Sequence, residues 1–441
     1  MKRLALRLKA KGQSCAVCSD NTADNVIKNI ASDCKQLQIA YLHDQSSELN
    51  GAPEPSADKV VENFLVKSKL YEEKDLHPYR KLLQLQKSYY HQLLKSNNVR
   101  YLLICEDGPG GNAPLIYSAK ACKIPVFVHP FGIGESKDYD NFIEDHHRLG
   151  SLNILDESAE TTDYIRERGK HWIRASKFGD VTLFPQSMVW ARLEEGLDLH
   201  SPWVVQGGGA DKLFVSSAMM KKHYLREGVP IKKIVEVGSI YADEVFETLS
   251  KNANLRKAYE TQSKIEAGTT SVLLTLLPNY HDVRGELCEF KDYTTLISNM
   301  LEKVNAIPGC EVSVSIHPNI LEKDYAIIKT LDINIEEEWL VSALPKYDIL
   351  MTQFSTTTRW AIGLKKPVIN YDPYCFGLQT YSEVPGVLTD QKLDESVRKL
   401  DELVNDNDAY ARIAQLQSQV AKRWATLDGQ NFERIYNYIN S

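Results

Sequence analysis

The chain has 441 residues, of which 43% are hydrophobic and 25% are charged, and its formal net charge is −7. This length exceeds one ordinary hydrophobic core and predicts two domains, while the average composition excludes a disordered or fibrous chain. The 52 Lys and Arg residues against 59 Asp and Glu residues provide no global basic field of the kind that holds nucleic acid. Composition therefore excludes classes of protein but identifies no chemistry.

A basic, leucine-containing segment opens the chain. Its five cations are Lys2, Arg3, Arg7, Lys9 and Lys11. The apolar run is too short for a signal peptide, and nowhere does a run reach the roughly 18 apolar residues needed to cross a bilayer. We therefore expect a soluble, cytoplasmic protein. We interpret the basic segment as a solvated first strand, with contact to an anionic inner membrane as the alternative.

Short apolar runs alternate with longer amphipathic segments through the first half of the chain, which predicts βα units and a mostly parallel sheet. The predicted strands cover residues 38–42, 101–105, 125–128, 181–184, 212–215 and 234–237. The predicted helices cover residues 57–69, 79–95 and 218–226.

The same pattern restarts after a polar, helix-prone stretch at 249–268, so we place a domain boundary between residues 245 and 268. The predicted strands of the second half cover residues 271–277, 311–316, 349–351 and 367–369. The fold class is therefore α/β, with one domain over 1–250 and a second over 268–405. The remaining residues, 406–441, are predicted to form helices that pack back across both domains.

Cysteine spacing gives little indication of a metal. Of the eight cysteines, only Cys15 and Cys18 have ligand spacing, and no second CxxC or HxxxH pair completes a zinc site. We expect no metal and no cofactor.

Ligands of parallel sheets bind beyond the carboxyl ends of the strands, so polar residues that follow predicted strands are the candidate site residues. Glu106-Asp107-Gly108 follows the strand at 101–105. One of two adjacent carboxylates can have a raised pKa and act as a general base. The alternative interpretation is an acidic helix cap and a tight turn.

Histidines end two further strands, as His129-Pro130 and His317-Pro318. An imidazole at this position can donate to an anionic ligand, although a lone histidine is more often a half-buried structural residue. His281 and Arg284 follow the first strand of the second domain and could face the same cleft.

A hydroxyl cluster, residues 353–358, lies between the strand at 349–351 and a predicted helix at 359–364. Consecutive hydroxyls and backbone N–H groups at a helix start suit a phosphate, and the alternative is an ordinary helix cap. No P-loop and no strand-anchored GxGxxG motif occurs, and we interpret the glycines at 207–209 as a flexible turn.

Together, these residues resemble a known group of enzymes. Glu106-Asp107-Gly108, His317-Pro318 and Ser355-Thr356 resemble, in that order, the acidic-acidic-Gly, His-Pro and Ser-Ser/Thr motifs of bacterial sialyltransferases and polysialyltransferases. Segments 226–239 and 347–369 are similar to the wider superfamily, which includes UDP-GlcNAc 2-epimerases, CDP-glycerol glycerophosphotransferases and Kdo transferases. The resemblance implies a GT-B fold, in which two Rossmann-like domains face a cleft.

The resemblance also implies an activity: transfer of a sialic-acid-like or Kdo-like sugar from a CMP donor to a glycan or lipid-linked glycan acceptor, in capsule or lipopolysaccharide biosynthesis, without a metal. Glu106 or Asp107 would deprotonate the acceptor, and His317 would donate to the CMP phosphate. The further residues assigned to the donor site are Pro318, Ser355, Thr356, Glu338 and His281.

Three alternatives remain open: a UDP-sugar or CDP-polyol transferase, a UDP-GlcNAc 2-epimerase-like enzyme, and a non-catalytic nucleotide-sugar-binding relative. Gln353 and Phe354 stand where the CDP-glycerol enzymes typically have Asp, which disfavours a CDP-polyol transferase. Residues 278–286 match the epimerase pattern only loosely, which also disfavours that alternative. A retaining transferase would need a carboxylate nucleophile. The candidates for that nucleophile are Asp107, Asp156, Glu157 and Asp211.

Overall fold

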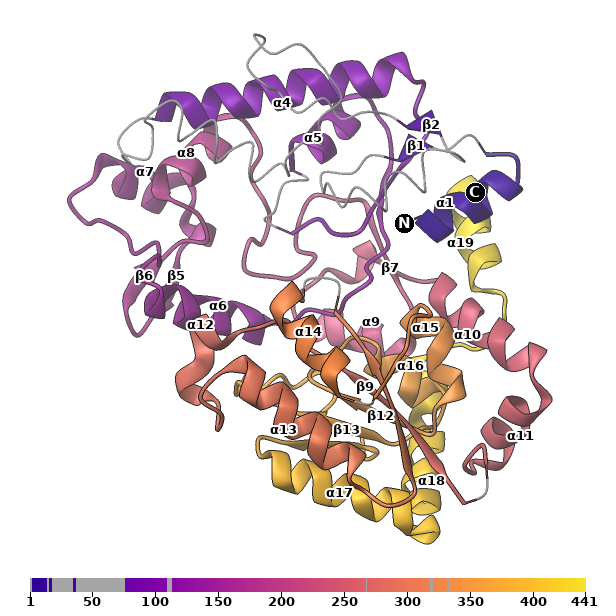
Figure 1. Cartoon of the computed structure of the whole chain (residues 1–441). Helices are drawn as coiled ribbons and strands as arrows, with labels where there is room; N and C mark the ends of the chain where they lie inside the picture. The colour runs from indigo at the N-terminus through magenta and orange to yellow at the C-terminus, as the bar shows by residue number, and fades with distance from the viewer. Residues whose placement is uncertain are drawn as a thin grey trace.

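The computed structural model describes residues 2–13, 16–17, 35–36, 76–108, 113–266, 268–317, 320–331 and 333–441. The predicted strand at 38–42, the predicted helix at 57–69, and Cys15 and Cys18 lie outside the described residues. Figure 1 shows two lobes, one built from the first half of the chain and one from the second.

The first domain contains a four-stranded parallel sheet in the order β3-β4-β7-β8. Its strands are β3 (Leu102–Ile104), β4 (Val126–Val128), β7 (Lys212–Val215) and β8 (Ile234–Glu236), which confirms the four predictions at these positions. Helices α4 (Leu76–Ser96), α5 (Ala113–Ala121), α9 (Ala218–Arg226) and α10 (Ile240–Lys251) connect or flank the strands. The continuous apolar runs are explained by burial of β4 and β7 between these helices.

A helical insertion separates β4 from β7. It contains α6 (Ser136–Arg148), α7 (Glu160–Arg168), the antiparallel pair β5 (Arg174–Ser176) and β6 (Gly179–Val181), and α8 (Gln186–Glu194). The predicted strand at 181–184 is wrong, because β6 ends at Val181, where it pairs with β5 in a separate two-stranded sheet and forms a single bridge with Ile154. The Thr182 hydroxyl then donates to the Phe184 carbonyl at 2.7 Å, which closes a local turn instead of extending the strand.

The second domain contains a six-stranded parallel sheet in the order β11-β10-β9-β12-β13-β14. The four inner strands β9 (Thr270–Thr275), β10 (Cys310–Ser315), β12 (Ile349–Thr352) and β13 (Val368–Tyr371) confirm the predictions. The edge strands β11 (Asn334–Ile335) and β14 (Val387–Asp390) were not predicted. The helices of this domain are α12 (His281–Arg284), α13 (Tyr293–Asn305), α14 (Glu322–Thr330), α15 (Leu340–Ala343), α16 (Thr358–Gly363) and α17 (Leu393–Asn405).

The two domains share a hydrophobic core. One cluster combines Phe127 and Phe214 of the first sheet with Leu350, Trp360 and Val368 of the second domain. The rings of Phe127 and Phe214 stack with 5.3 Å between centroids. The polar stretch before the second domain is helical, as predicted, over the end of α10 and α11 (Ala253–Thr261).

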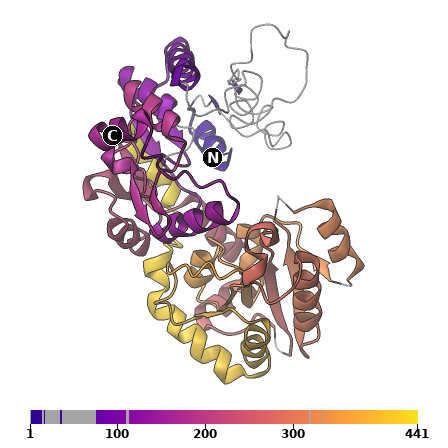
Figure 2. The same cartoon turned by 90° about the vertical axis from the view of Figure 1, so that its left-hand side faces the viewer.

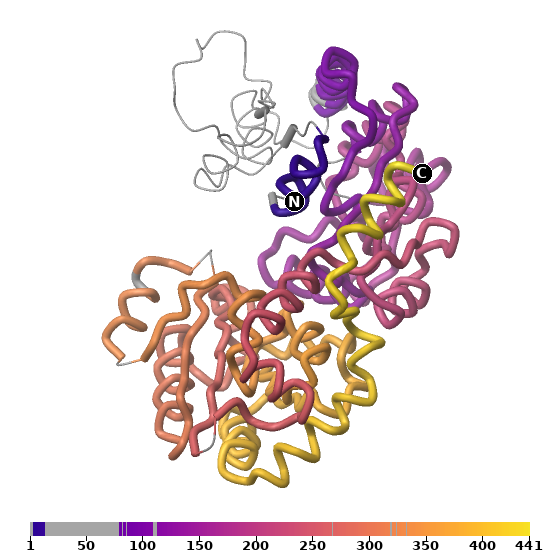
Figure 3. Tube along the Cα trace, turned by 90° about the vertical axis from the view of Figure 1, so that its right-hand side faces the viewer, coloured from indigo at the N-terminus to yellow at the C-terminus, as the bar shows by residue number. Residues whose placement is uncertain are grey.

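The chain ends in helices α18 (Asn407–Trp424) and α19 (Asn431–Asn440). Helix α18 packs against α16 and reaches α9 of the first domain, and α19 packs against α10. Figures 2 and 3 show this C-terminal segment, in yellow, running from the second lobe to the first. The start of α19 is held by Asp243, which accepts from the backbone N–H groups of Asn431 at 3.0 Å and Phe432 at 2.8 Å.

The N-terminal basic segment forms a helix, α1 (Lys2–Ala10), so the predicted first strand is wrong. Its cations bind acidic residues of other helices: Arg3 pairs with Glu244, and Lys11 lies 2.7 Å from Glu433. The guanidinium of Arg3 also lies 3.7 Å from the Trp339 ring centroid. The basic side chains therefore attach α1 to the protein. Among the described residues, no helix combines the length and apolar character needed to cross a bilayer.

Candidate functional site

The two adjacent carboxylates that follow β3 have different environments. Glu106 is exposed, whereas Asp107 is fully buried, with 0% of its surface exposed. Both residues lie in the loop after β3, where Glu106 faces solvent and Asp107 packs against segment 206–210. Glu106 therefore remains a candidate base, and Asp107 is directed into the domain.

Asp107 forms a buried ion pair that the sequence did not indicate. Lys233, directly before β8, places Nζ 2.6 Å from Asp107 Oδ2, and the backbone N–H of Ala210 donates to the same oxygen at 2.8 Å. Burial lowers the pKa of Lys233, and the Asp107 carboxylate opposes that shift. A side chain at Gly208 would place Cβ only 1.5 Å from the Asp107 carbonyl oxygen. The triglycine segment is thus a close-packing site, not the flexible turn that we expected.

His129, at the end of β4, is enclosed by the two domains. It is 4% exposed, and its ring lies 6.1 Å from that of Tyr241. Burial lowers the pKa of His129 to about 4, and the positive charge of Arg359 adds to the shift. His129 is therefore neutral at physiological pH and lies out of reach of a ligand in solvent.

The loop after β4 contacts the hydroxyl cluster of the second domain. A Cβ built on Gly132 would lie 3.7 Å from the Thr356 methyl carbon, and Arg359 donates to the Phe131 carbonyl. The Phe131 ring packs edge-on against Tyr241, with 5.2 Å between centroids. We refer to this meeting of segments 129–134 and 353–359 as the interdomain junction.

The hydroxyl cluster itself forms a compact turn. Phe354 adopts a left-handed backbone, with a φ of 56°, and its N–H donates to the Asn370 side chain at 2.8 Å. This conformation directs Ser355 and Thr356 to a half-buried position, whereas Thr357 is buried. The hydroxyls of Ser355 and Thr357 lie 2.6 Å apart. The turn thus provides two partly accessible hydroxyls at the start of α16.

Arg359 is a buried cation at the same place. Its side chain is 1% exposed, and its Nε finds no hydrogen-bond acceptor among the described residues. Burial lowers its pKa, and the described residues provide it with no carboxylate partner. In such a low-dielectric setting, the charge of Arg359 acts strongly on neighbouring groups. The sequence shows an arginine directly after the hydroxyls, but not that it is buried.

Two other predicted residues are held by structural contacts. The ring of His281 lies between the Tyr374 hydroxyl, at 2.8 Å from Nδ1, and the Phe290 carbonyl, at 3.2 Å from Nε2. Arg284 is 2% exposed and lies 2.8 Å from Asp145 of α6, which joins the domains. Both ring nitrogens of His281 therefore have protein partners, so the structure does not favour it as a phosphate donor.

The remaining predicted residues lie towards the edge of the second sheet. His317 follows β10, as expected, and is half-buried, and burial lowers its pKa. Pro318 lies outside the described residues. Glu338 forms an ion pair with Lys346, a contact that competes with a role on a ribose.

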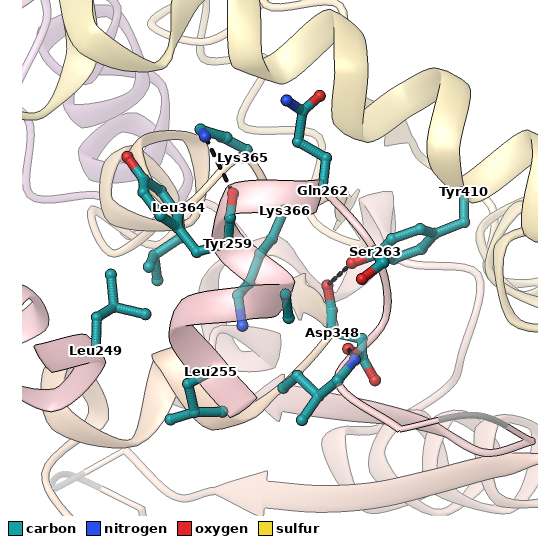
Figure 4. A pocket seen from close by; sticks show the side chains of 12 residues that line it. Leu249, Leu255, Tyr259, Gln262, Ser263, Asp348, Leu364, Lys365, Lys366 and Tyr410 are labelled. Carbon is teal, nitrogen blue, oxygen red and sulfur yellow. Dashed lines mark hydrogen bonds between the residues drawn. The ribbon is translucent and has the colours of Figure 1, made fainter. Parts of the chain in front are cut away.

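A small hollow lies away from the interdomain junction, where β12 and β13 begin (Figure 4). It encloses only about 10 Å³, which is about the minimum for one water molecule. Lys366, fully buried beside it, donates to the carbonyls of Leu344, Pro345 and Tyr347. The hollow is therefore a small gap in the packing between these elements, and it is too small to hold a substrate. In the described part of the chain, no three His, Cys, Asp or Glu side chains gather in a way that could hold a metal ion.

Two Rossmann-like domains joined in this way define a GT-B fold, as predicted. Solved structures share it. A putative UDP-N-acetylglucosamine 2-epimerase from Listeria monocytogenes matches with a TM-score of 0.53 at 14% identity, over 100% of this chain and 92% of the other. The UDP-GlcNAc 2-epimerase from Neisseria meningitidis, bound to UDP-GlcNAc, matches with a TM-score of 0.52 at 13% identity, over 100% and 96% of the two chains.

A third structure, the wall teichoic acid polymerase TagF, matches more weakly, with a TM-score of 0.42 at 13% identity, over 77% and 72% of the two chains. No protein-family model matches the sequence, and no curated protein matches it significantly. At these identities the likeness establishes the fold alone.

Proposed function

We propose that this protein is an enzyme that acts on a nucleotide-activated sugar, with UDP-sugars as the first class of substrate. The observation that carries the proposal is the arrangement of the two strand ends. One offers the exposed carboxylate of Glu106, and the other offers Ser355 and Thr356 beside the buried cation Arg359. Two solved structures that match with TM-scores above 0.5 are a putative UDP-GlcNAc 2-epimerase and a UDP-GlcNAc 2-epimerase that contains UDP-GlcNAc.

The hydroxyl cluster would bind the phosphates of the nucleotide. The partly accessible hydroxyls of Ser355 and Thr356 can donate directly to phosphate oxygens. Arg359 is fully buried, so it would act through its field and not by contact. A positive field at this point favours both a bound phosphate and the charge that develops on it when the bond to the sugar breaks.

Glu106 would act as the base. Inverting a C–H centre of a sugar requires a group that removes a proton, and transfer to an acceptor requires a group that deprotonates a hydroxyl. The neighbouring ion pair of Asp107 with Lys233 fixes the backbone that carries Glu106. We assign Glu106 the proton transfer and Asp107 the positioning of the strand end.

Transfer of a sialic-acid-like or Kdo-like sugar from a CMP donor is the second candidate. The observation that favours it is the order of the short motifs around Glu106, His317 and Ser355, each of which follows a strand of the fold. The two candidates share the nucleotide position and the base. They differ in the nucleotide that is recognised and in the fate of the sugar.

Incubation with UDP-GlcNAc, CMP-sialic acid and CMP-Kdo, each alone, distinguishes these candidates. Chromatography reports released UDP or CMP, and proton NMR reports an epimerised sugar. We expect turnover of the UDP-sugar, whereas CMP release with thermal stabilisation by CMP alone would select the second candidate. A protein that no nucleotide stabilises and no substrate turns over would refute both.

Glu106→Gln tests the base. We expect it to lower turnover by roughly 10²–10⁴-fold while the nucleotide still binds, because only the proton transfer is removed. Glu260→Gln is the matched control, since Glu260 is also exposed and forms a single surface ion pair among the described residues, with Arg256 at 3.1 Å. Equal turnover by the Glu106 variant and the control would contradict the assignment.

A further inference from the structure

A second cavity lies where helix α9 of the first domain approaches α18 and segment 379–384 of the second domain. It has a volume of about 170 Å³. Its walls include neither Glu106 nor Ser355 nor Thr356, so it is separate from the proposed substrate site. Its lining combines cations at the opening with an apolar floor.

Three cations surround the opening of this cavity: Lys222 and Arg226 on α9, and Arg423 on α18. Arg226 has a carboxylate nearby, with Glu383 3.6 Å from its guanidinium. Neither the Lys222 nor the Arg423 side chain has a hydrogen bond or ion pair to any residue that the structure describes. Because two cations from different domains lack a counter-charge, the opening carries a local positive field that an anion would neutralise.

The floor of the cavity is apolar. Trp424 is 3% exposed and Val384 is 5% exposed, and both belong to a small hydrophobic cluster that Met219 and Val420 also contact. The Trp424 ring has Tyr381 behind it, with 5.1 Å between ring centroids, which holds the indole in place. A compact apolar group could pack against this wall and be removed from water.

We propose that this cavity binds a small organic anion that joins one ring-sized apolar group to a phosphate or carboxylate. The apolar group would lie against Trp424, and the anionic group would lie between Lys222 and Arg423. A cavity of about 150 Å³ is known to accept a molecule the size of benzene, so the volume suits a single ring. Neither the charge nor the apolar floor alone would select this class of ligand.

Because the cavity lies between the two domains, a bound ligand would affect their relative orientation. Its walls come from both domains, and two of its residues already bridge them: Gln379 N–H donates to Glu135 at 2.8 Å, and the Thr380 hydroxyl donates to the same carboxylate. A ligand that contacts both walls binds best when the domains have the orientation seen here. Binding would therefore stabilise that orientation.

Titration calorimetry of the full chain with phenyl phosphate tests the proposal. We expect one site, with clearly weaker binding of inorganic phosphate, which lacks the ring, and of phenol, which lacks the charge. Benzoate in place of phenyl phosphate reports whether a carboxylate also satisfies the cations. Equal affinity for phenyl phosphate and inorganic phosphate would overturn the proposal, because the apolar floor would then have no role.

Variants locate the site. Arg423→Gln and Lys222→Gln change exposed side chains without described partners, so folding should be unaffected, and each should weaken phenyl phosphate binding by roughly tenfold. Arg412→Gln is the matched control and should bind normally, because Arg412 lies on the same helix, forms an ion pair with Glu402 and is not part of the cavity wall. Unchanged affinity in both cavity variants would refute the site. Displacement of phenyl phosphate by UDP or CMP would also refute it, because the ligand would then occupy the proposed substrate site.

Discussion

Two buried charges, Asp107 of the first domain and Arg359 of the second, differ in how they are compensated. Asp107 of the first domain has a cation, Lys233, at 2.6 Å, together with a backbone donor. Arg359 of the second domain has a backbone carbonyl and a thioether, but no carboxylate among the described residues. Asp107 is therefore neutralised by Lys233 in an ion pair with a structural role. Arg359 retains a field that can act on a ligand, which is why we associate nucleotide binding with the second domain.

The largest expected effect is on stability, at the ion pair of Asp107 with Lys233. Lys233→Met should lower the free energy of unfolding by about 3–5 kcal/mol, because it leaves the Asp107 carboxylate buried without its cation. Urea denaturation measures this change. Lys232→Met is the matched control, since that neighbouring side chain is exposed and should alter stability by less than about 0.5 kcal/mol.

The double variant Asp107→Asn with Lys233→Met sharpens the same prediction. It removes both charges, so part of the stability lost in the single variant should return. A double variant no more stable than Lys233→Met would show that packing, and not the uncompensated charge, determines the loss.

The next effect concerns pH, because burial, with the field of Arg359, lowers the pKa of His129 and keeps it neutral. The pKa of His129 is lowered to about 4 in the folded protein, against about 6.5 in an unfolded chain. The unfolded state therefore binds more protons between these values. The contribution of neutral, buried His129 to the free energy of unfolding is fully present above about pH 6.5. It is lost as the pH falls towards 4, by on the order of 3 kcal/mol.

His129→Gln should remove this part of the pH dependence. Urea denaturation near pH 7 and near pH 4.5 should show a smaller loss of stability in the variant than in the wild type. His200→Gln, which changes an exposed histidine, should behave like the wild type. Identical pH dependence in all three proteins would contradict a buried, neutral His129.

The sequence predicted the four strands of the first sheet and the four inner strands of the second because each contains an apolar run, which is typical of parallel strands covered by helices. The edge strand β11, only two residues long, carries no such signal. For the candidate site, the sequence indicated which polar residues follow the strands, but not which of them are buried. Glu106 and Asp107 are adjacent acidic residues after the same strand, so the sequence does not distinguish their roles. Asp107 differs in its ion pair with Lys233, which lies 126 positions away in the sequence and is brought near by the order of the strands.

The smallest expected effect on stability is at Arg359, which has no carboxylate partner among the described residues. Arg359→Met should change the free energy of unfolding by less than about 1 kcal/mol, because two contributions oppose each other. The guanidinium no longer has to be buried, but the Phe131 carbonyl loses its donor. Nucleotide affinity should nevertheless fall by roughly tenfold or more, since the field at the hydroxyl cluster disappears. Isothermal titration with UDP separates the two readouts. A variant that is strongly destabilised but binds UDP normally would reverse the comparison, because Arg359 would then be a structural residue like Lys233.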